Sequence, residues 1–144
     1  MNRGGVHHID LTVKDAHASR AFYEGVLGFM GYTLATSYPI GYDFDLVDDR
    51  VGFCSIGIRS ASGPNAARQH DRYTPGLHHM AWTAESRADV DAMHAHLQKI
   101  GAVITDAPAD YPHYGEGYYA VFFTDPDGLK LEYVFKPQKQ TART

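Results

Sequence analysis

The sequence has little cysteine. Its single cysteine, Cys54, means that no disulfide can form within one chain of 144 residues. A lone thiol suits a reducing compartment. The first residues also lack the apolar stretch of roughly 7–15 residues that is typical of a secretory signal. We therefore expect a cytoplasmic protein.

An excess of positive charge and long hydrophobic runs are missing too. Lys and Arg number 13 against 17 Asp and Glu, which gives a formal net charge of −4. No basic cluster is present to hold a phosphate backbone, so nucleic acid is not an expected partner. No segment is apolar over the length of a membrane span. A hydrophobic content of 44% is nevertheless enough for a packed core, and the length suits a single domain.

What the chain does contain is an internal repeat. Residues 5–13, GVHHIDLTV, align without gaps with residues 76–84, GLHHMAWTA, at an offset of 71. Four of the nine positions are identical, and both copies contain a pair of adjacent histidines. Repetition at a fixed offset indicates two copies of one supersecondary unit.

Each copy continues with a helical pattern. The first helix is expected over residues 15–27 with Gly28 as its stop, and the second over residues 86–100 with Gly101 as its stop. Ser86 and Asp89 have the spacing of an N-terminal capping pair.

Sequence rich in β-forming residues follows each helix. Residues 106–117 contain too much Pro and Gly for a helix or strand, so we expect a loop there. Residues 125–128, DPDG, are typical of a tight turn that joins two strands as a hairpin. The expected strands are 32–38, 42–47 and 51–59 in the first copy, and 103–105, 118–124 and 129–135 in the second.

These elements predict an α+β protein made of two βαβββ modules. The modules span residues 5–59 and 76–136, with a linker at 60–75 and a polar tail at 137–144. We expect one domain, 1–144, in which the modules form a cupped mixed sheet with the helices outside.

Alternation along the strands indicates which histidine of each pair can reach a shared site. Neighbouring side chains on a strand point to opposite faces. Apolar residues occupy the odd positions of 9–13, so the helix should cover them and leave His8 on the polar face. His7 is then expected to be a structural residue.

The same reasoning places His79 and Glu132 on the polar face of the second module, and makes His78 structural. Two imidazoles and one carboxylate can bind a divalent metal with open positions for substrate, and zinc, iron(II), manganese, cobalt and nickel are all chemically possible. A lone histidine or glutamate on a sheet is more often merely solvated. Repetition of the histidine in both modules favours the metal site.

The arrangement of modules resembles the vicinal oxygen chelate superfamily over essentially the whole chain. The resemblance rests on the histidine that begins each module, on the ending DPDGLKLE, and on residues 21–29, AFYEGVLGF. It implies that two modules close around a metal, either within one chain or between swapped chains, and we expect a homodimer. The matching ligand positions are His8, His79 and Glu132.

The superfamily covers several reactions. Its glyoxalase I and epimerase members add a fourth ligand from the last strand of the first module, yet residues 51–59 contain no Glu, Gln or His. The signature of its extradiol dioxygenases fits from His113 to Glu132 except at Phe122, where those enzymes have a tyrosine that contacts substrate. Its thiol transferases open fosfomycin, and its antibiotic-binding members lack the metal.

The resemblance implies a metal-dependent, glyoxalase-like lyase or isomerase whose small substrate chelates the metal through adjacent oxygens. The alternatives are an Fe(II) dioxygenase and a protein that sequesters an antibiotic. Proton transfer would fall to Asp10, His113, Tyr119 or a metal-bound water. Asp10 shares the face of His8, so it could be a base, could orient His8, or could simply be solvated. His113 lies in the loop that could close over substrate, or that could simply pack on the sheet edge.

Overall fold

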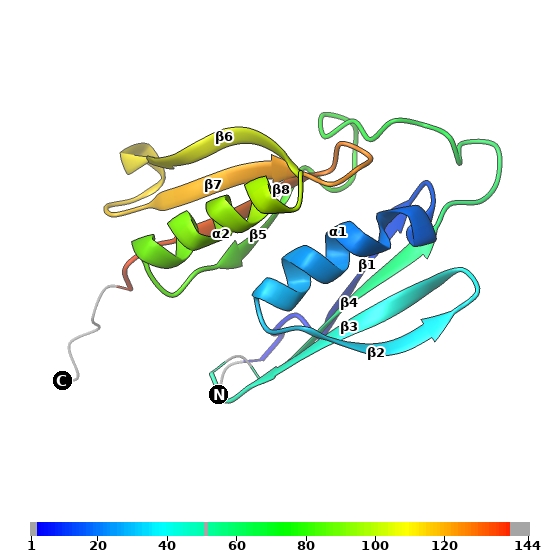
Figure 1. Cartoon of the computed structure of the whole chain (residues 1–144), viewed down its shortest axis with the longest axis horizontal. Coiled ribbons are helices and arrows are strands. Elements are labelled where there is room, and N and C mark those ends of the chain that lie inside the picture. Colours follow the sequence, from blue (N-terminus) through cyan, green and yellow to red (C-terminus); the bar gives the residue numbers. More distant parts are fainter. Residues whose placement is uncertain (1–2, 51, 139–144) are drawn as a thin grey trace. The chain divides into compact units, whose positions relative to one another are not determined.

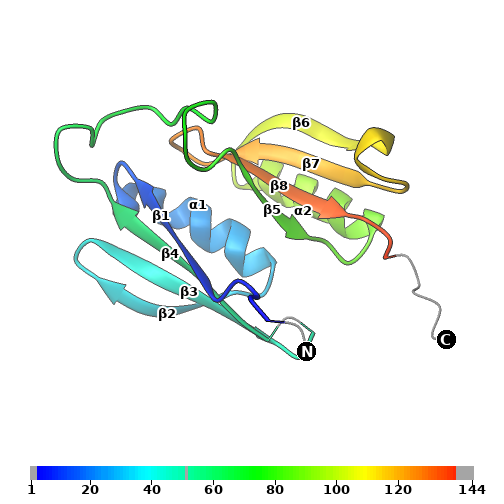
Figure 2. The ribbon, with the colours of Figure 1, turned by 180° about the vertical axis from the view of Figure 1, so that it is seen from behind.

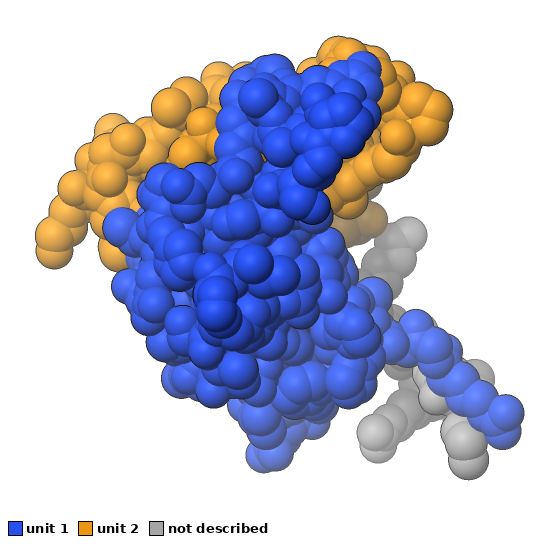
Figure 3. Space-filling model, turned by 90° about the vertical axis from the view of Figure 1, so that its right-hand side faces the viewer, with its two compact units in different colours: residues 1–69 blue, residues 70–144 orange. Residues whose placement is uncertain are grey.

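The computed structural model of the protein describes residues 3–50 and 52–138 (Figure 1). Within it the chain forms two compact units, residues 1–69 and 70–144 (Figure 3). The boundary between them falls in the segment expected to be a linker. Most of the expected polar tail, residues 139–144, and the first residue of one expected strand, Val51, lie outside the described residues.

Unit 1 has the order strand, helix and three strands. Its sheet has the order β1-β4-β3-β2, in which β1 runs parallel to β4 and the other pairs are antiparallel. The helix packs on one face of this sheet (Figure 1). The elements are β1 (His8–Val13), α1 (Ala16–Phe29), β2 (Thr33–Tyr38), β3 (Gly41–Asp48) and β4 (Gly52–Ser60).

Unit 2 repeats this topology. Its sheet has the order β5-β8-β7-β6, with β5 parallel to β8 and the other pairs antiparallel. The predicted α+β fold of two βαβββ modules is therefore confirmed, and each module has a four-stranded sheet of its own. The elements are β5 (Met80–Thr83), α2 (Arg87–Lys99), β6 (Val103–Asp110), the short 3-10 helix η1 (Pro112–Tyr114), β7 (Tyr119–Thr124) and β8 (Lys130–Phe135).

The ends of α2 follow the prediction. The Ser86 hydroxyl accepts a hydrogen bond from the Asp89 backbone N–H at 3.0 Å, and the Asp89 carboxylate accepts one from the Glu85 backbone N–H at 2.9 Å. Gly101 follows the helix with a positive φ of 72°. Neither helix in the described part of the chain is long and apolar enough to cross a membrane.

The predicted stop of α1 at Gly28 is wrong. The helix continues through Gly28 to Phe29, and the residue with left-handed backbone geometry is Gly31, at φ 97°. Both glycines lie near the end of the apolar pattern. Because a left-handed glycine just beyond the last helical residues is what closes a helix, Gly31 fulfils that role.

The expectation of a loop over residues 106–117 is also wrong in part. Strand β6 continues to Asp110, and η1 follows it. Pro108 is tolerated because β6 lies at the edge of the sheet and its register shifts between Asp106 and Ala109. An edge strand needs no backbone N–H donor at such a position.

The predicted hairpin between β7 and β8 is confirmed. Gly128 has a φ of 84° and its N–H donates to the Asp125 carbonyl oxygen at 3.0 Å. Asp125 is buried, and its Oδ1 accepts from the N–H groups of Asp127 and Leu129 at 2.9 and 2.8 Å. The strand after the turn is thereby fixed in register, which places Glu132.

Candidate metal centre

Each sheet has one face covered by its own helix and one open face, and Figure 2 shows α2 behind the sheet of unit 2. On β1, Leu11 and Val13 are buried while His8 and Asp10 are exposed. Strand β5 alternates in the same way, with Met80 buried and its neighbour exposed. The predicted alternation is confirmed for these strands.

Glu132 lies on the face of unit 2 that α2 does not cover, yet its side chain is only 2% exposed. It lies on β8 between Ala81 of β5 and Phe122 of β7. Its Oε1 is 3.4 Å from Nε2 of His79, and its Oε2 accepts a hydrogen bond from the Tyr118 hydroxyl. Two of the three expected metal ligands, His79 and Glu132, are therefore neighbours in unit 2.

Both histidine pairs share one arrangement. The Nδ1 atoms of His7 and His8 are 3.0 Å apart, and those of His78 and His79 are 2.7 Å apart. The two rings of each pair are thus in contact, which alternation along a strand does not predict. The reason is that β1 begins at His8 and β5 begins after His79, so strand alternation does not yet constrain the pairs.

The paired Nδ1 atoms have a chemical consequence. Such a contact needs one nitrogen as donor and the other as acceptor, so two neutral rings in this contact have opposite tautomers. Partial loss of solvent and the neighbouring His79 lower the pKa of His78, which favours its neutral form. With Nδ1 engaged, Nε2 is the nitrogen of His79 that faces Glu132.

These donors suit a divalent cation. An imidazole nitrogen and a carboxylate oxygen are both ligands of zinc and of divalent iron, manganese, cobalt and nickel. A carboxylate as buried as Glu132 is stabilised by a positive partner. Within residues 3–50 and 52–138, no three His, Cys, Asp or Glu side chains are placed so that they could hold a metal ion. The third expected ligand, His8, belongs to unit 1.

The open face of unit 1 carries a charged cluster that the sequence analysis reached only through Asp10. The Arg59 guanidinium lies 3.5 Å from Asp10 Oδ2 and 3.6 Å from Asp43 Oδ1, and the Tyr38 hydroxyl donates to Asp43 at 3.3 Å. Burial and the neighbouring Asp10 carboxylate raise the pKa of Asp43. Alternation along β3 and β4 indicates the faces of Asp43 and Arg59, whereas their contact with Asp10 depends on the register of the strands.

The strand registers show how the two open faces correspond. Gly57 lies between Asp10 and Asp43, just as Glu132 lies between its two neighbours in unit 2. A Cβ atom on Gly57 would lie 2.1 Å from Asp10 Oδ1 and 2.8 Å from Asp43 Oδ1. In unit 1, therefore, Gly57 occupies the position that Glu132 has in unit 2, and the side chains of Asp10 and Asp43 extend over this glycine.

The expected site residue His113 lies on η1, at the edge of an aromatic cluster. Its ring centroid is 4.1 Å from that of Tyr114, which packs against Tyr111 and Tyr118 at 5.8 and 5.4 Å. Tyr111 in turn packs against Phe122 at 5.3 Å. Rings from η1 and its flanks thus connect His113 to the row that contains Glu132.

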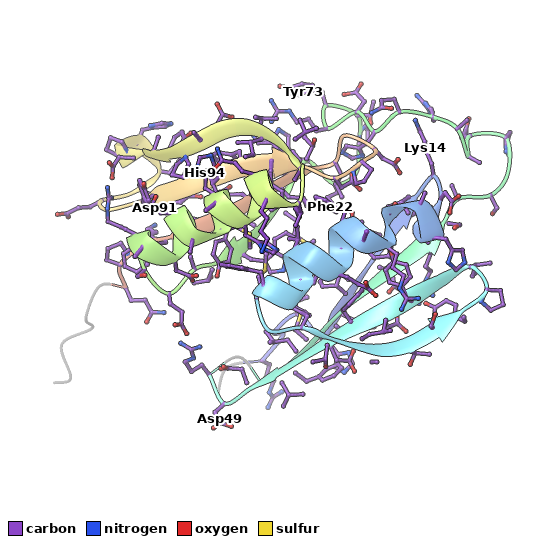
Figure 4. All side chains as sticks on the ribbon, viewed as in Figure 1. Lys14, Phe22, Asp49, Tyr73, Asp91 and His94 are labelled. Atoms are coloured by element: carbon purple, nitrogen blue, oxygen red, sulfur yellow. The ribbon has the colours of Figure 1, made fainter. Side chains whose placement is uncertain are left out.

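Tyr119 does not share the face of Glu132. Its hydroxyl donates to Asp91 of α2 at 2.5 Å, on the helix side of the sheet (Figure 4). The tyrosine that reaches Glu132 is Tyr118, which the sequence analysis missed. The signal was available, because Tyr118 has the same parity as Phe122 of β7, and Phe122 is paired with Glu132.

The sequence as a whole matches a known family model. Residues 5–133 match the model of the Glyoxalase/Bleomycin resistance protein/Dioxygenase superfamily. The chain belongs to this superfamily. It is also 34% identical, over 90% of its length and 97% of the relative's, to the protein YqjT of Bacillus subtilis (strain 168), which is described as uncharacterized.

Solved structures of the superfamily have the same fold. A proposed glyoxalase from Bacillus halodurans has a TM-score of 0.77 at 27% identity, over 93% of this chain and 97% of that one. A lactoylglutathione lyase from Agrobacterium tumefaciens has a TM-score of 0.66 at 18% identity, over 94% and 96% of the two chains. At that identity the second comparison shows the fold alone.

Proposed function

We propose that the protein is a divalent-metal-dependent enzyme of the superfamily, a glyoxalase-like lyase or isomerase. Its ligands would be His8, His79 and Glu132, and its substrate a small molecule that chelates the metal through adjacent oxygens. The observation that supports this most is the approach of His79 Nε2 to Glu132 Oε1 at 3.4 Å. An open site of this kind is chemically expensive to keep for mere binding, since an aromatic cleft alone can hold a ligand.

When bound, the metal would act as a Lewis acid that stabilises negative charge on the substrate oxygens. The chain's own residues would transfer the proton and exclude water from the substrate. Asp10 shares the open face of His8 and is our candidate for moving the proton, with Arg59 holding its carboxylate in place. His113 is the second candidate. Its place beside Tyr114 would let the segment around η1 exclude water from bound substrate.

One alternative is an Fe(II)-dependent, extradiol-type ring-cleaving dioxygenase. It needs the same three ligands, and the stacked rings of Tyr111 and the exposed Tyr114 are a suitable surface for a planar ring. The second alternative is a protein that sequesters a small molecule such as an antibiotic. That function would use the same aromatic surface without the metal.

A turnover screen on metal-reconstituted protein tests these functions. The panel covers glutathione hemithioacetals, catechols under oxygen, and fosfomycin with thiols, and His79→Ala serves as the inactive control. Metal-dependent product with the hemithioacetals would support the proposed lyase, and product with catechols and iron would support the dioxygenase. Tight binding without turnover, unchanged when the metal is removed, would overturn both.

We further propose that the protein acts as a cytoplasmic homodimer. The location is suggested by its single cysteine. Dimers are common in the superfamily, and a dimer would let the modules pair either within a chain or between chains. Sedimentation equilibrium that returned the mass of a single chain at micromolar concentration would contradict the dimer.

A further inference from the structure

We infer that Tyr118 is a positioning residue for Glu132, and that it determines which carboxylate oxygen is presented to the metal. This inference rests on the proposed metal site. It starts from the two oxygens of Glu132, which have different partners. Oε2 accepts the Tyr118 hydroxyl, whereas Oε1 lies 3.4 Å from His79 Nε2.

The surroundings of Glu132 make this hydrogen bond decisive. The carboxylate is 2% exposed and lies in a strand row between Ala81 and Phe122, neither of which has a side-chain donor. Without a donor, a buried carboxylate oxygen loses the hydrogen bonds that water would have supplied. Tyr118 therefore supplies a protein donor to the oxygen that does not face His79.

Tyr118 is itself well held. Its ring packs against Tyr114 and Tyr111, with centroids 5.4 and 6.4 Å away, and its carbonyl oxygen accepts from the Tyr111 N–H at 2.8 Å. A phenol hydroxyl whose ring is held by this packing donates to one fixed carboxylate oxygen. It therefore keeps Glu132 in one orientation, with Oε1 on the side of His79.

Carboxylates that bind metals depend on such partners, and loss of one typically weakens metal affinity by about 10–100-fold. We therefore expect Tyr118→Phe to bind Co²⁺ about 10–100-fold more weakly than the wild type, as measured by competition with a chromogenic chelator. The visible absorption of the bound Co²⁺ should change shape as well, because Oε2 would be released and could also act as a ligand. A purely structural role for Tyr118 would leave that spectrum unchanged.

Tyr133→Phe is the matched control. Tyr133 follows Glu132 on β8, is buried, and donates its hydroxyl to the Asp89 carboxylate at 2.8 Å on the helix side. The control removes a comparable hydrogen bond from the opposite face of the same strand, so its Co²⁺ affinity should stay within about twofold of wild type. An equal loss of affinity in both variants would overturn the inference, since it would indicate general destabilisation.

A measurement on the wild type guards against a variant that fails to fold. The Tyr118 hydroxyl proton, assigned through its ring protons, should give a slowly exchanging NMR signal that persists after Zn²⁺ is added. Loss of that signal on Zn²⁺ binding would contradict the inference, because the hydroxyl would then have left Glu132. If wild type binds Co²⁺ and Tyr118→Phe binds it equally well, the inference fails and the metal site stands. If wild type binds no Co²⁺, both fail together.

Discussion

At the scale of single residues, Gly41 illustrates how close packing restricts what a position can hold. It begins β3, and a Cβ atom placed on it would lie 2.0 Å from the Ile58 carbonyl oxygen and 3.1 Å from the Arg59 Cα. Both contacts are with backbone atoms of the neighbouring strand, which cannot rotate away. Only glycine therefore allows β3 and β4 to approach at this point.

We expect Gly41→Ala to lower the free energy of unfolding by about 3 kcal/mol, the cost of overpacking at a site that cannot relax. Urea denaturation monitored by circular dichroism measures it. Gly28→Ala is the matched control. Gly28 lies within α1, and a Cβ atom there would meet no other described part of the chain within 4 Å beyond its own helix backbone, so alanine should stabilise by about 0.5–1 kcal/mol. Equal effects at the two positions would contradict this account.

At the scale of elements, a buried tyrosine joins the first helix to its sheet. Tyr42 on β3 is fully buried, and its hydroxyl donates to the Ala16 carbonyl oxygen at the start of α1, at 2.9 Å. Burial raises the pKa of Tyr42 far above the ordinary tyrosine value of about 10. The unfolded chain therefore loses this proton at a lower pH than the folded chain does.

The stabilisation from Tyr42 should thus be complete below about pH 10 and be lost as the pH rises beyond that value. Tyr42→Phe should be less stable than wild type by about 1 kcal/mol at pH 8, because one hydrogen bond is missing. This difference in stability should narrow between pH 10 and pH 11. In that range the unfolded wild-type chain loses the Tyr42 proton while the folded chain keeps it, so wild type loses stability and the Phe variant does not. Urea denaturation of both proteins at pH 8 and at pH 11 measures this difference in the free energy of unfolding. A difference that stays constant or widens with pH would contradict the role given to the Tyr42 hydroxyl.

The elements also show how far the sequence alone could lead. The 71-residue repeat and the alternation of β1, β5 and β8 were enough for the βαβββ topology and for the face of Glu132. The true end of α1 could not be read from composition, because two glycines, Gly28 and Gly31, are both able to end a helix. The length of β6 depends on its place at the sheet edge, which a single strand does not reveal.

The side-chain faces of site residues could be predicted within strands, where side chains alternate, but not for residues at or before the start of a strand. The histidine pairs precede or begin their strands, so contact between their Nδ1 atoms could not be inferred from alternation. Tyr118 and Tyr119 are adjacent, and it is Tyr118 that has the parity of Phe122 and reaches Glu132. The two aspartates over Gly57 required the register of three strands, which only the structure supplies.

At the scale of the whole molecule, the two units carry different parts of the proposed ligand set. Unit 2 holds His79 and the buried Glu132, while unit 1 holds His8, with Asp10 on the same face. The repeat therefore duplicated the histidine and its paired neighbour but not the glutamate. One carboxylate with two histidines would give one metal site for each pair of modules.

Metal content measured after purification without chelators, followed by reconstitution with Co²⁺, tests this central claim most directly. Wild type and His94→Ala, whose histidine lies on α2 (Figure 4) and is not one of the proposed ligands, should each hold about one ion per pair of modules. His8→Ala and Glu132→Ala should each hold far less, since each lacks one of three ligands. Equal metal content in all four proteins would contradict the proposed site.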